Sequence, residues 1–423
     1  MQESDVESIH QQTVENFNKV RSHWAYLCKP LVKEDYVLQT AAGASPPKWH
    51  MAHTTWFFEQ FILNNYFRGY QVYHPDYHFL FNSYYNSAGD FIDRHVRGMI
   101  SRPTIDEVNS YRAYVDEHMN SLLNQLDDHP FEEIHPLLQL GINHEQQHQE
   151  LFLMDIKNIF YQNPIRPVYQ EIDYSHSQPV PFDWIESEAG MITIGYNGDG
   201  FCYDNEQPAH KTYIHACKMA NRLILNGEYL EFMEAGGYTD SRYWLSDGWD
   251  TINQNNWQAP LYWDKTEADW EIFTLGGTRK LNENEPVCHL SYYEADAFAR
   301  WKGVRLPTEF EWERYAANSK IEGNFMDNGG YHPKTPMQNG SQVLHLFGDL
   351  WEWTQSPYSG YPGYESLADG VGEYNGKFMC NQFVLRGGCC ATPKNHIRKT
   401  YRNFYYPHDR WAFTGLRLAK NIK

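Results

Sequence analysis

The sequence predicts an α+β protein that begins with a bundle of helices and ends in a second, loop-rich domain. Three observations support this fold class. Apolar residues recur at helical spacing through residues 1 to about 165. Prolines then cluster between positions 164 and 181, and the chain beyond them is rich in Gly, Tyr and Trp. Aromatic residues make up 16% of the chain, which indicates short strands and loops held by ring packing, or a pocket lined by rings.

The first 165 residues contain four segments long enough to form a four-helix bundle. These segments are Glu7 to Leu27, Lys48 to Phe67, Ile105 to Leu126 and His135 to Tyr161. The third follows Thr104, and Glu107 lies three residues later, which is the spacing of a capping box. A bundle of this kind is a usual place for a metal site built from facing side chains.

A long aromatic segment, residues 70–102, connects the second and third predicted helices. It contains Asn82-Ser-Tyr-Tyr-Asn-Ser-Ala-Gly-Asp90, followed by Arg94 and Arg97. A connection of this length inside a compact domain is more often functional than idle.

The second half of the chain shows short, irregular patterns. Apolar runs such as 191–194 and 383–385 predict strands, and helical patterns occur at Asn226 to Ala235, Ser291 to Trp301 and Thr308 to Ala317. We therefore expect a helical domain at 1–165, a linker at 166–183 and a second domain at 184–423.

Charge and composition exclude several classes of function. The net charge of −19 argues against nucleic acid or an anionic membrane surface as the main partner. No apolar run reaches transmembrane length, and the acidic first seven residues are unlike a signal peptide. The seven cysteines form no CxxC pair and fit a reducing compartment better than a disulfide framework. We therefore expect a cytoplasmic protein.

Two histidines in the fourth predicted helix have the spacing of metal ligands. His144 and His148 are four residues apart, so both imidazoles lie on one helical face about one turn apart. One metal ion can then take two ligands from a single rigid element. Gln147 lies on nearly the same face, where its amide can reach a substrate beside the metal.

Two other interpretations of this helix stay open. An i,i+4 pair of histidines can be an ordinary surface or core pair. The stretch His144-Glu-Gln-Gln-His148 also spells the HExxH motif of zinc hydrolases, in which Glu145 would be the general base. The extended motif requires Gly and His where Leu151 and Met154 stand, although a downstream Glu could be the third zinc ligand.

A third histidine comes from the second predicted helix. The stretch 49–59 reads Trp-His-Met-Ala-His-Thr-Thr-Trp-Phe-Phe-Glu and contains His50 and His53. If one of these two histidines faces the pair in the fourth helix, the three imidazoles form a metal site with open coordination positions. Three neutral imidazoles suit Fe(II), Zn or Cu, so the histidines alone leave the metal open.

The second half contains six short motifs, each of which occurs once. They are Glu234-Ala-Gly-Gly-Tyr238, Pro286-Val-Cys-His-Leu-Ser-Tyr292, Arg305-Leu-Pro-Thr-Glu-Phe-Glu-Trp312, Gly348-Asp-Leu-Trp-Glu-Trp-Thr354, Leu385-Arg-Gly-Gly388 and Phe413-Thr-Gly-Leu-Arg-Leu418. Together, in this order, they resemble the formylglycine-generating-enzyme (sulfatase-modifying-factor) fold, a C-type-lectin-like domain. Enzymes of that name use two cysteines several residues beyond the Gly-Gly. Here Cys389 and Cys390 follow it directly, so we do not expect the cysteine-oxidising activity.

A DinB-like bundle joined to such a domain resembles the sulfoxide synthases of ergothioneine and ovothiol biosynthesis, over nearly the whole chain. The signature of that family stands at residues 49–59. Its three iron-binding histidines match His53, His144 and His148, and the later histidine of the signature is the ligand, which favours His53 over His50. The resemblance therefore implies Fe(II) as cofactor and O₂ as co-substrate.

The resemblance also implies roles for residues around the metal. Gln147 matches a glutamine that hydrogen-bonds the substrate imidazole. Arg94 and Arg97 match arginines that bind the carboxylate of the thiol substrate. Tyr84 and Tyr85 match the active-site tyrosines of the branch that carries them in the N-terminal loop; another branch carries its tyrosine in the C-terminal domain. Without the resemblance, we would interpret the two tyrosines as packing residues and the two arginines as part of a solvent-exposed surface.

Three residues near the C-terminus belong to the implied substrate pocket. Asn403 matches a contact to the hercynine carboxylate. Phe404 and Trp411 are pocket walls, since aromatic faces attract a trimethylammonium group. One branch has an aspartate that pairs with the amino group of γ-glutamylcysteine, and that position holds Tyr405 here. The absence of this acid favours free cysteine.

These observations predict an iron- and O₂-dependent sulfoxide synthase. It would join the sulfur of cysteine, or of γ-glutamylcysteine, to C2 of the imidazole of hercynine (Nα-trimethylhistidine) and give the sulfoxide. Histidine as acceptor, or a selenium donor, fits the sequence equally well. A zinc hydrolase and a non-catalytic metal-binding module are the alternatives from other classes. The expected partners are small molecules, with no nucleic acid and no membrane, and the oligomeric state stays open.

Overall fold

The computed structural model describes residues 3–125, 128–174, 177–338, 340, 343–366 and 374–422. The chain divides into two units. The first contains Met1–Asn163 and Leu367–Tyr374, and the second contains Pro164–Ser366 and Asn375–Lys423.

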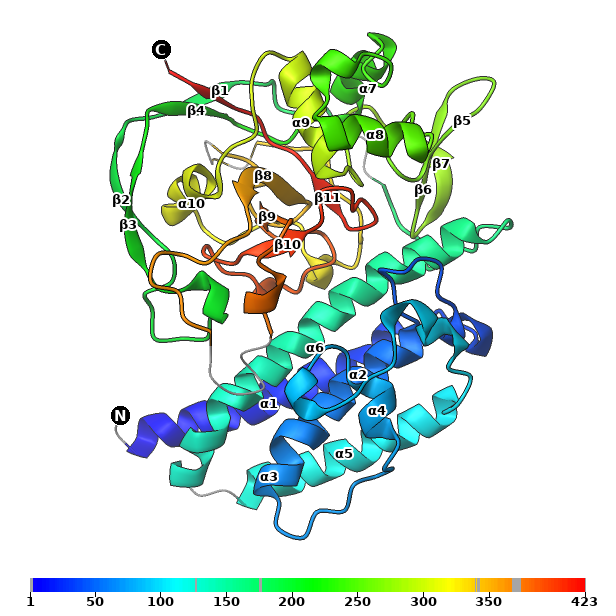
Figure 1. The fold of residues 1–423 in the computed structure, drawn as a ribbon, viewed down its shortest axis with the longest axis vertical. Helices are drawn as coiled ribbons and strands as arrows, with labels where there is room; N and C mark the ends of the chain where they lie inside the picture. The colour runs from blue at the N-terminus through cyan, green and yellow to red at the C-terminus, as the bar shows by residue number, and fades with distance from the viewer. Residues whose placement is uncertain are drawn as a thin grey trace. The chain divides into compact units, whose positions relative to one another are not determined.

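The first unit is a bundle of four long helices joined by shorter ones. The helices are α1 (Glu3–Leu27), the 3-10 helix η1 (Lys33–Val37), α2 (Pro47–Phe58), the π-helix η2 (Glu59–Leu63), α3 (Asn64–Tyr66), α4 (Tyr77–Phe81), the 3-10 helices η3 (Asn86–Ala88) and η4 (Arg94–Met99), α5 (Ile105–Gln125) and α6 (Asp128–Gln162). Helix α2 packs against both α5 and α6, and α1 packs against α6 (Figure 1). The helical bundle predicted from the apolar periodicity is confirmed.

The close approach of α2 and α6 depends on a glycine. A Cβ atom at Gly141 of α6 would lie 2.6 Å from the ring of Phe58 and 3.0 Å from the ring of Phe57. Because real Cβ atoms cannot approach ring carbons so closely, only glycine lets the two helices pack at this distance. This contact lies just ahead of His144 and fixes how the histidines of the two helices face each other.

The second predicted helix is interrupted in the structure. The expected segment 48–67 divides into α2, η2 and α3, and the wider π turn begins at Glu59. The buried Glu59 carboxylate accepts hydrogen bonds from the phenols of Tyr70 (2.7 Å) and Tyr111 (2.6 Å). A π turn of this kind often marks a functional segment. Here it places an acid where it anchors the start of the long aromatic connection.

Other boundaries follow from local residues. Helix α6 begins at Asp128 rather than His135, because Phe131 and Ile134, each 1% exposed, extend its apolar face ahead of Pro136. The capping box of α5 is confirmed: the backbone N–H of Glu107 donates to Thr104 Oγ1 (3.3 Å), and that of Thr104 donates to Glu107 Oε2 (2.6 Å). Among the described residues, no helix has both the length and the apolar composition that crossing a lipid bilayer requires.

The second unit combines short strands with short helices. The strands are β1 (Trp184–Ser187), β2 (Gly190–Ile194), β3 (His210–Ile214), β4 (Cys217–Ala220), β5 (Trp263–Lys265), β6 (Trp270–Thr274), β7 (Gly277–Lys280), β8 (Trp351–Pro357), β9 (Phe383–Arg386), β10 (Asn403–Tyr405), β11 (Thr414–Gly415) and β12 (Ala419–Asn421). The helices are α7 (Asn226–Glu234), α8 (Ser246–Gln254), α9 (Tyr292–Trp301), α10 (Glu309–Ala317), and the 3-10 helices η5 (Asp204–Glu206), η6 (Ser241–Tyr243), η7 (Met326–Asn328), η9 (Gly376–Phe378) and η10 (Lys394–His396).

The strands of this unit form small sheets. A four-stranded sheet has the order β10-β9-β8-β11, in which β11 runs parallel to β8 and the other pairs are antiparallel. Two three-stranded sheets, β1-β4-β12 and β5-β6-β7, and the pair β2-β3 complete the described strands (Figure 1). The predicted α+β class is confirmed. Helix α8 was missed because Gly248 and two aspartates weaken its helical pattern.

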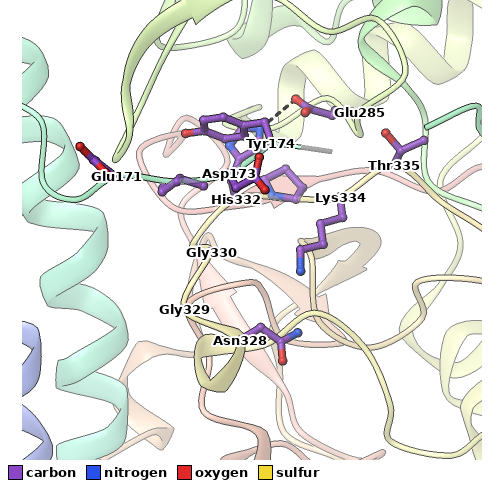
Figure 2. Close-up of a pocket in the computed structure, with 12 residues that line it drawn as sticks. Glu171, Asp173, Tyr174, Glu285, Asn328, Gly329, Gly330, His332, Lys334 and Thr335 are labelled. Carbon is purple, nitrogen blue, oxygen red and sulfur yellow. Dashed lines mark hydrogen bonds and ion pairs between the residues drawn. The ribbon is translucent and has the colours of Figure 1, made fainter. Parts of the chain in front are cut away.

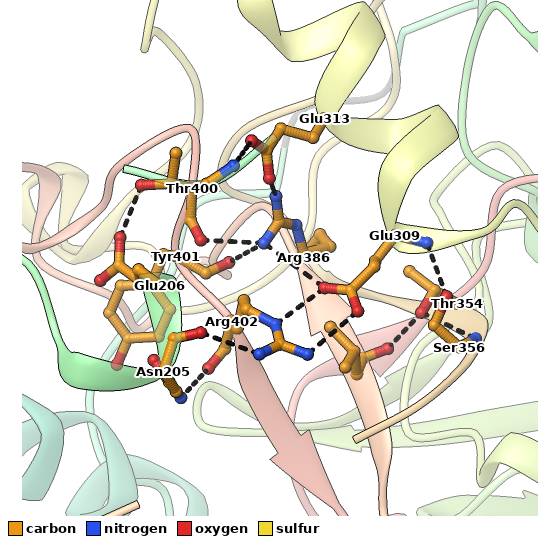
Figure 3. A network of polar contacts seen from close by, with 12 residues as sticks. Asn205, Glu206, Glu309, Glu313, Thr354, Ser356, Arg386, Thr400, Tyr401 and Arg402 are labelled. Carbon is orange, nitrogen blue, oxygen red and sulfur yellow. Dashed lines mark hydrogen bonds and ion pairs between the residues drawn. The ribbon is translucent and has the colours of Figure 1, made fainter. Parts of the chain in front are cut away.

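Buried ion pairs hold together a unit with so little continuous sheet. The guanidinium of Arg402 donates to both carboxylate oxygens of Glu309, at 2.8 and 3.0 Å, and Arg386 is paired with Glu313 (Figure 3). Arg386 also donates to the backbone carbonyl of Thr400 at 2.9 Å. The network therefore links α10, β9 and the segment that leads into β10. Removing one partner of such a buried pair typically costs about 3–5 kcal/mol.

Candidate metal centre

Three buried histidines meet where α2 packs against α6. His53 comes from α2, and His144 and His148 come from α6. One ring nitrogen of each lies within 4.8 Å of the others, and the three residues are 0%, 1% and 9% exposed. The Nε2 atoms of His53 and His144 are 3.1 Å apart, which suits two nitrogens that each lie about 2.1 Å from one ion.

The orientation of His53 is fixed by its neighbours. Its ring stacks on Trp49 at 4.6 Å and on Trp56 at 5.7 Å between centroids. Its Nδ1 lies 2.6 Å from the carbonyl oxygen of Phe81 and must donate, because a carbonyl only accepts. The neutral imidazole then carries no proton on Nε2. That nitrogen is free to face the other two histidines as a ligand.

Burial keeps the cluster uncharged. It lowers the pKa of His144 to about 3, and it lowers the pKa values of His53 and His148 well below the ordinary range, with repulsion among the histidines as a further cause. All three are therefore neutral at physiological pH and offer lone pairs. A donor set of three neutral imidazoles without a carboxylate fits a divalent transition metal.

The structure brings to the cluster a tyrosine that no motif in the sequence marks. The phenol of Tyr374 donates a hydrogen bond to Gln147 Oε1, and its ring lies 5.6 Å from that of His144. Tyr374 belongs to the first unit although it follows Gln147 by 227 residues. No local pattern separates it from the other tyrosines. The one available signal was the family branch that carries its tyrosine in the C-terminal domain.

The two predicted tyrosines differ in their surroundings. Tyr85 is fully buried, and its ring packs against Trp56 at 5.7 Å and Phe61 at 5.2 Å. Tyr84 is half-buried, stacks on Tyr85 at 4.6 Å, and lies 6.5 Å from the ring of Tyr374. Of the pair, Tyr84 is therefore the one that extends toward the phenol beside the histidines.

Arg97 is a buried cation. It is 2% exposed and donates to Ser45 Oγ (3.1 Å) and Ser83 Oγ (2.9 Å). Within the described part of the chain, it forms no ion pair with a carboxylate and its Nε has no hydrogen-bond partner. Burial, with the charge of Arg94 as a second cause, holds its pKa well below the usual range. Arg94 itself is exposed and is bonded to a backbone carbonyl.

Glu145 is bound by two arginines. Its Oε2 accepts from Arg21 at 2.8 Å and its Oε1 accepts from Arg112 at 3.0 Å, and the carboxylate is fully buried. Glu145 is also not part of the histidine cluster. A general base for a metal-bound water must have a carboxylate oxygen available to that water. The geometry therefore disfavours the zinc-hydrolase interpretation of the HExxH stretch.

The remaining predicted residues lie in the second unit, around β10. Asn403 Oδ1 accepts from the backbone N–H of Phe404 at 2.9 Å. The ring of Phe404 stacks on Tyr358 at 4.1 Å, and the ring of Trp411 meets Tyr405 at 5.3 Å. Phe404 and Trp411 thus each pack on a tyrosine, but on different ones, and adjacent strand residues such as Phe404 and Tyr405 point to opposite faces.

A cavity of about 230 Å³ lies in the second unit, lined by residues 171–174, 328–330 and 332–335 and by Glu285 (Figure 2). His332 Nε2 lies 3.0 Å from Glu285 Oε2, and the guanidinium of Arg279 lies over the Tyr174 ring at 3.9 Å. None of the residues predicted to be functional lines this cavity.

Family comparisons agree with this architecture. Residues 178–422 match the sulfatase-modifying factor enzyme 1-like domain, and residues 16–152 match the DinB superfamily. The resemblances inferred from the motifs are therefore confirmed for both parts of the chain.

Proteins named hercynine oxygenase are similar to most of this chain. A hercynine oxygenase of Mycobacterium tuberculosis (strain ATCC 25618 / H37Rv) is 31% identical over 66% of this chain and 70% of that protein. One from Mycolicibacterium smegmatis is 28% identical over 74% of this chain and 78% of its own length. The formylglycine-generating enzyme of Bos taurus is 24% identical over 51% of this chain and 71% of that protein. The chain therefore belongs to the hercynine oxygenase family of enzymes, with a DinB-type helical region followed by a sulfatase-modifying-factor-like domain.

Proposed function

We propose that this enzyme is an iron(II)- and O₂-dependent sulfoxide synthase. It joins the sulfur of cysteine, or of γ-glutamylcysteine, to C2 of the hercynine imidazole and yields the sulfoxide. The observation that carries the proposal is the cluster of three buried, neutral histidines in a member of the hercynine oxygenase family. The expected domain limits, 1–165 and 184–423 with a linker at 166–183, belong to the same proposal and are supported by the end of α6 at Gln162.

His53, His144 and His148 are the proposed ligands of the iron. Bound there, Fe(II) supplies open coordination positions and acidifies a coordinated thiol, so that the sulfur is a thiolate at neutral pH. The protein's part is to keep three imidazoles neutral and aimed at one point. Burial does the first, and the stacking of His53 between two tryptophans contributes to the second.

Arg97 is the proposed anchor for the carboxylate of the thiol substrate. A buried guanidinium without a carboxylate partner in the described residues is costly, and an incoming carboxylate relieves that cost. Arg94, three residues earlier, adds positive charge at the exposed side. The position that holds an acid in the γ-glutamylcysteine branch is Tyr405, which supports cysteine as the preferred thiol.

Gln147 and the phenols act on the second substrate and on protons. The Gln147 amide lies on α6 between two proposed ligands, where its oxygen can accept the N–H of a substrate imidazole. Tyr374 already donates to the same oxygen, so its proton is held next to that position. Tyr84, with Tyr85 behind it, is the neighbouring phenol. Asn403, Phe404 and Trp411 remain the proposed contacts for the hercynine carboxylate and trimethylammonium groups.

The test is metal analysis and turnover with protein purified without oxygen. We expect one iron per chain, and O₂ uptake only when hercynine and cysteine are both present. Mass spectrometry should then find the coupled sulfoxide. Stoichiometric zinc with no O₂ uptake would overturn the proposal. Equal turnover of histidine in place of hercynine would instead assign the ovothiol-type reaction, and a selenium donor consumed faster than cysteine would change the donor.

A further inference from the structure

We infer that His50 and Asp155 are positioning residues that set the tautomer of His148. The three residues form a buried chain of hydrogen bonds, Asp155 to His50 to His148, that leaves Nε2 of His148 free to ligate a metal. The inference rests on the proposed metal ligation by His148, and it concerns neither substrate nor reaction.

The chain of contacts is continuous. His50 Nδ1 lies 2.8 Å from His148 Nδ1, and His50 Nε2 lies 3.0 Å from Asp155 Oδ2. His50 and Asp155 are each 2% exposed. His50 stands on α2, one turn before His53, and Asp155 stands on α6, two turns after His148. The same helix pair therefore supplies both the ligands and this chain.

The direction of each hydrogen bond follows from the acid at its end. An ionised carboxylate only accepts, so His50 Nε2 carries the proton that bonds Asp155. A neutral His50 then presents a lone pair on Nδ1. The proton between the two Nδ1 atoms must therefore belong to His148, and the Nε2 of His148 is left without one. The opposite tautomer would place a proton where the metal must bind.

Asp155 is itself held in place. Its Oδ2 accepts the backbone N–H of Ser45 at 2.8 Å, in addition to the bond from His50. Ser45 Oγ in turn accepts from Arg97, so the chain and the proposed carboxylate anchor share one residue. With two donors fixing its position, the Asp155 carboxylate gives His50 a single favoured orientation.

The other ligands show why this chain matters. His53 has its tautomer set by the Phe81 carbonyl. His144 Nδ1 has no hydrogen-bond partner within the described part of the chain. His148 is thus the second proposed ligand whose proton position the described residues set, through the contacts of His50 and Asp155.

The experiment measures Fe(II) affinity of the substrate-free protein by anaerobic titration against a competing chelator. His50→Leu removes both hydrogen bonds, and we expect it to weaken Fe(II) binding about 10- to 100-fold, as loss of such partners typically does. Asp155→Asn should weaken binding too, because a neutral amide oxygen accepts a weaker hydrogen bond from His50 than a carboxylate does and so favours the required tautomer less. His50→Gln should restore affinity to within about threefold of the parent, since its amide can both donate and accept.

The control is His135→Leu, which removes another histidine of α6, the helix that carries His148. The His135 ring nitrogen contacts Thr13 and Gln139 instead of the cluster. We expect unchanged Fe(II) affinity. The visible spectrum of the Co(II)-loaded proteins gives a second readout, and the His50→Leu and Asp155→Asn spectra should change while the His50→Gln spectrum should match the parent. Thermal unfolding of the metal-free variants shows which of them are folded.

Parent-like Fe(II) affinity in both His50→Leu and Asp155→Asn would overturn the inference. So would an equal loss in His50→Gln and His50→Leu, because that would make the role of His50 one of packing. If His50→Leu does not fold, the Fe(II) affinities of Asp155→Asn and His50→Gln test the inference, because only the first is expected to fall. A parent protein that binds no divalent metal would instead refute the proposed function, so the two failures are distinguishable.

Discussion

The guanidinium of Arg97 lies over the ring of Trp49, with its central carbon 3.4 Å from the ring centroid. Trp49 also stacks on His53, so one aromatic ring separates the buried cation from a proposed iron ligand. An aromatic face partly compensates a buried cation, but it does so less well than a carboxylate. The arrangement therefore holds the Arg97 guanidinium next to the histidine cluster, where the proposed carboxylate of the thiol substrate would bind.

Replacement of Arg97 should separate binding of the thiol from the reaction. We expect Arg97→Gln to raise KM for cysteine roughly 10- to 100-fold, because a hydrogen bond to a charged group contributes about 1.5–3 kcal/mol. The KM for hercynine should change little. Steady-state kinetics with each substrate varied in turn gives both values. Arg94→Gln, at an exposed position, is the comparison and should show a smaller rise. A parent-like KM for cysteine in Arg97→Gln would contradict the assignment.

Loss of Glu145 should cost stability more than turnover. Glu145→Gln leaves Arg21 and Arg112 without their shared carboxylate, so we expect the free energy of unfolding to fall by about 3–5 kcal/mol. The folded fraction should keep its iron and retain turnover within about tenfold of the parent. Denaturant unfolding and iron analysis measure these effects. Glu133→Gln, an exposed acid on the same helix, is the matched control. Complete loss of turnover with unchanged stability would revive a hydrolase-type role.

The phenol of Tyr374 should steer the product. Without a proton donor beside Gln147, oxidation of the thiol to cysteine sulfinate should compete with C–S coupling, since general-acid assistance is typically worth about 10²–10⁴-fold. We expect Tyr374→Phe to retain iron and bind both substrates while most product becomes sulfinate. A Tyr84→Phe, Tyr85→Phe double variant should shift in the same direction but less, because Tyr85 packs against Trp56 and Phe61. Mass spectrometry of the products ranks the variants, and an unchanged sulfoxide yield from Tyr374→Phe would refute the expectation.

A buried histidine of the second unit should make stability depend on pH. Burial, with the charge of Arg398 as a lesser cause, lowers the pKa of His396 well below the ordinary value near 6.5. Below about pH 6.5, the unfolded chain therefore binds a proton at this residue that the folded chain does not bind. Stability consequently falls as pH decreases, by up to about 1.4 kcal/mol per pH unit from this residue.

His396→Gln isolates that contribution and keeps a polar group toward the hydroxyl of Tyr401, 3.0 Å from His396 Nε2. Between pH 7.5 and 5.5, the variant should lose about 1.4 kcal/mol less than the parent. Urea unfolding followed by tryptophan fluorescence at both pH values gives the difference. Contributions from all other groups are the same in both proteins and cancel in the difference. If the parent and the variant lost the same free energy of unfolding between pH 7.5 and 5.5, His396 would not contribute to the pH dependence.

The sequence predicts best those features that depend on neighbours along the chain. The spacing of His144 and His148 and the capping box of Thr104 and Glu107 repeat at short intervals, and the structure reproduces both arrangements. The bundle follows from the same periodicity. The metal itself did not follow from spacing, because three neutral imidazoles suit several ions.

The features missed by sequence depend on contacts between distant segments. Glu145 is adjacent to a proposed ligand, but its role follows from Arg21 and Arg112 on two other helices. His50 seemed only an alternative to His53, because its bond to Asp155 joins residues 105 positions apart. Such pairings depend on how helices pack, which periodicity within one helix does not encode.

The position of Tyr374 in the sequence limits how this enzyme can be truncated or recombined with relatives. A chain ended after α6 would keep the three histidines but lose the phenol bound to Gln147, because that side chain is encoded more than two hundred residues downstream. Exchanging the C-terminal part with that of a relative would likewise replace the residue that donates to Gln147. A chimaera between relatives therefore keeps the hydrogen bond to Gln147 only where position 374 still supplies a donor to that side chain.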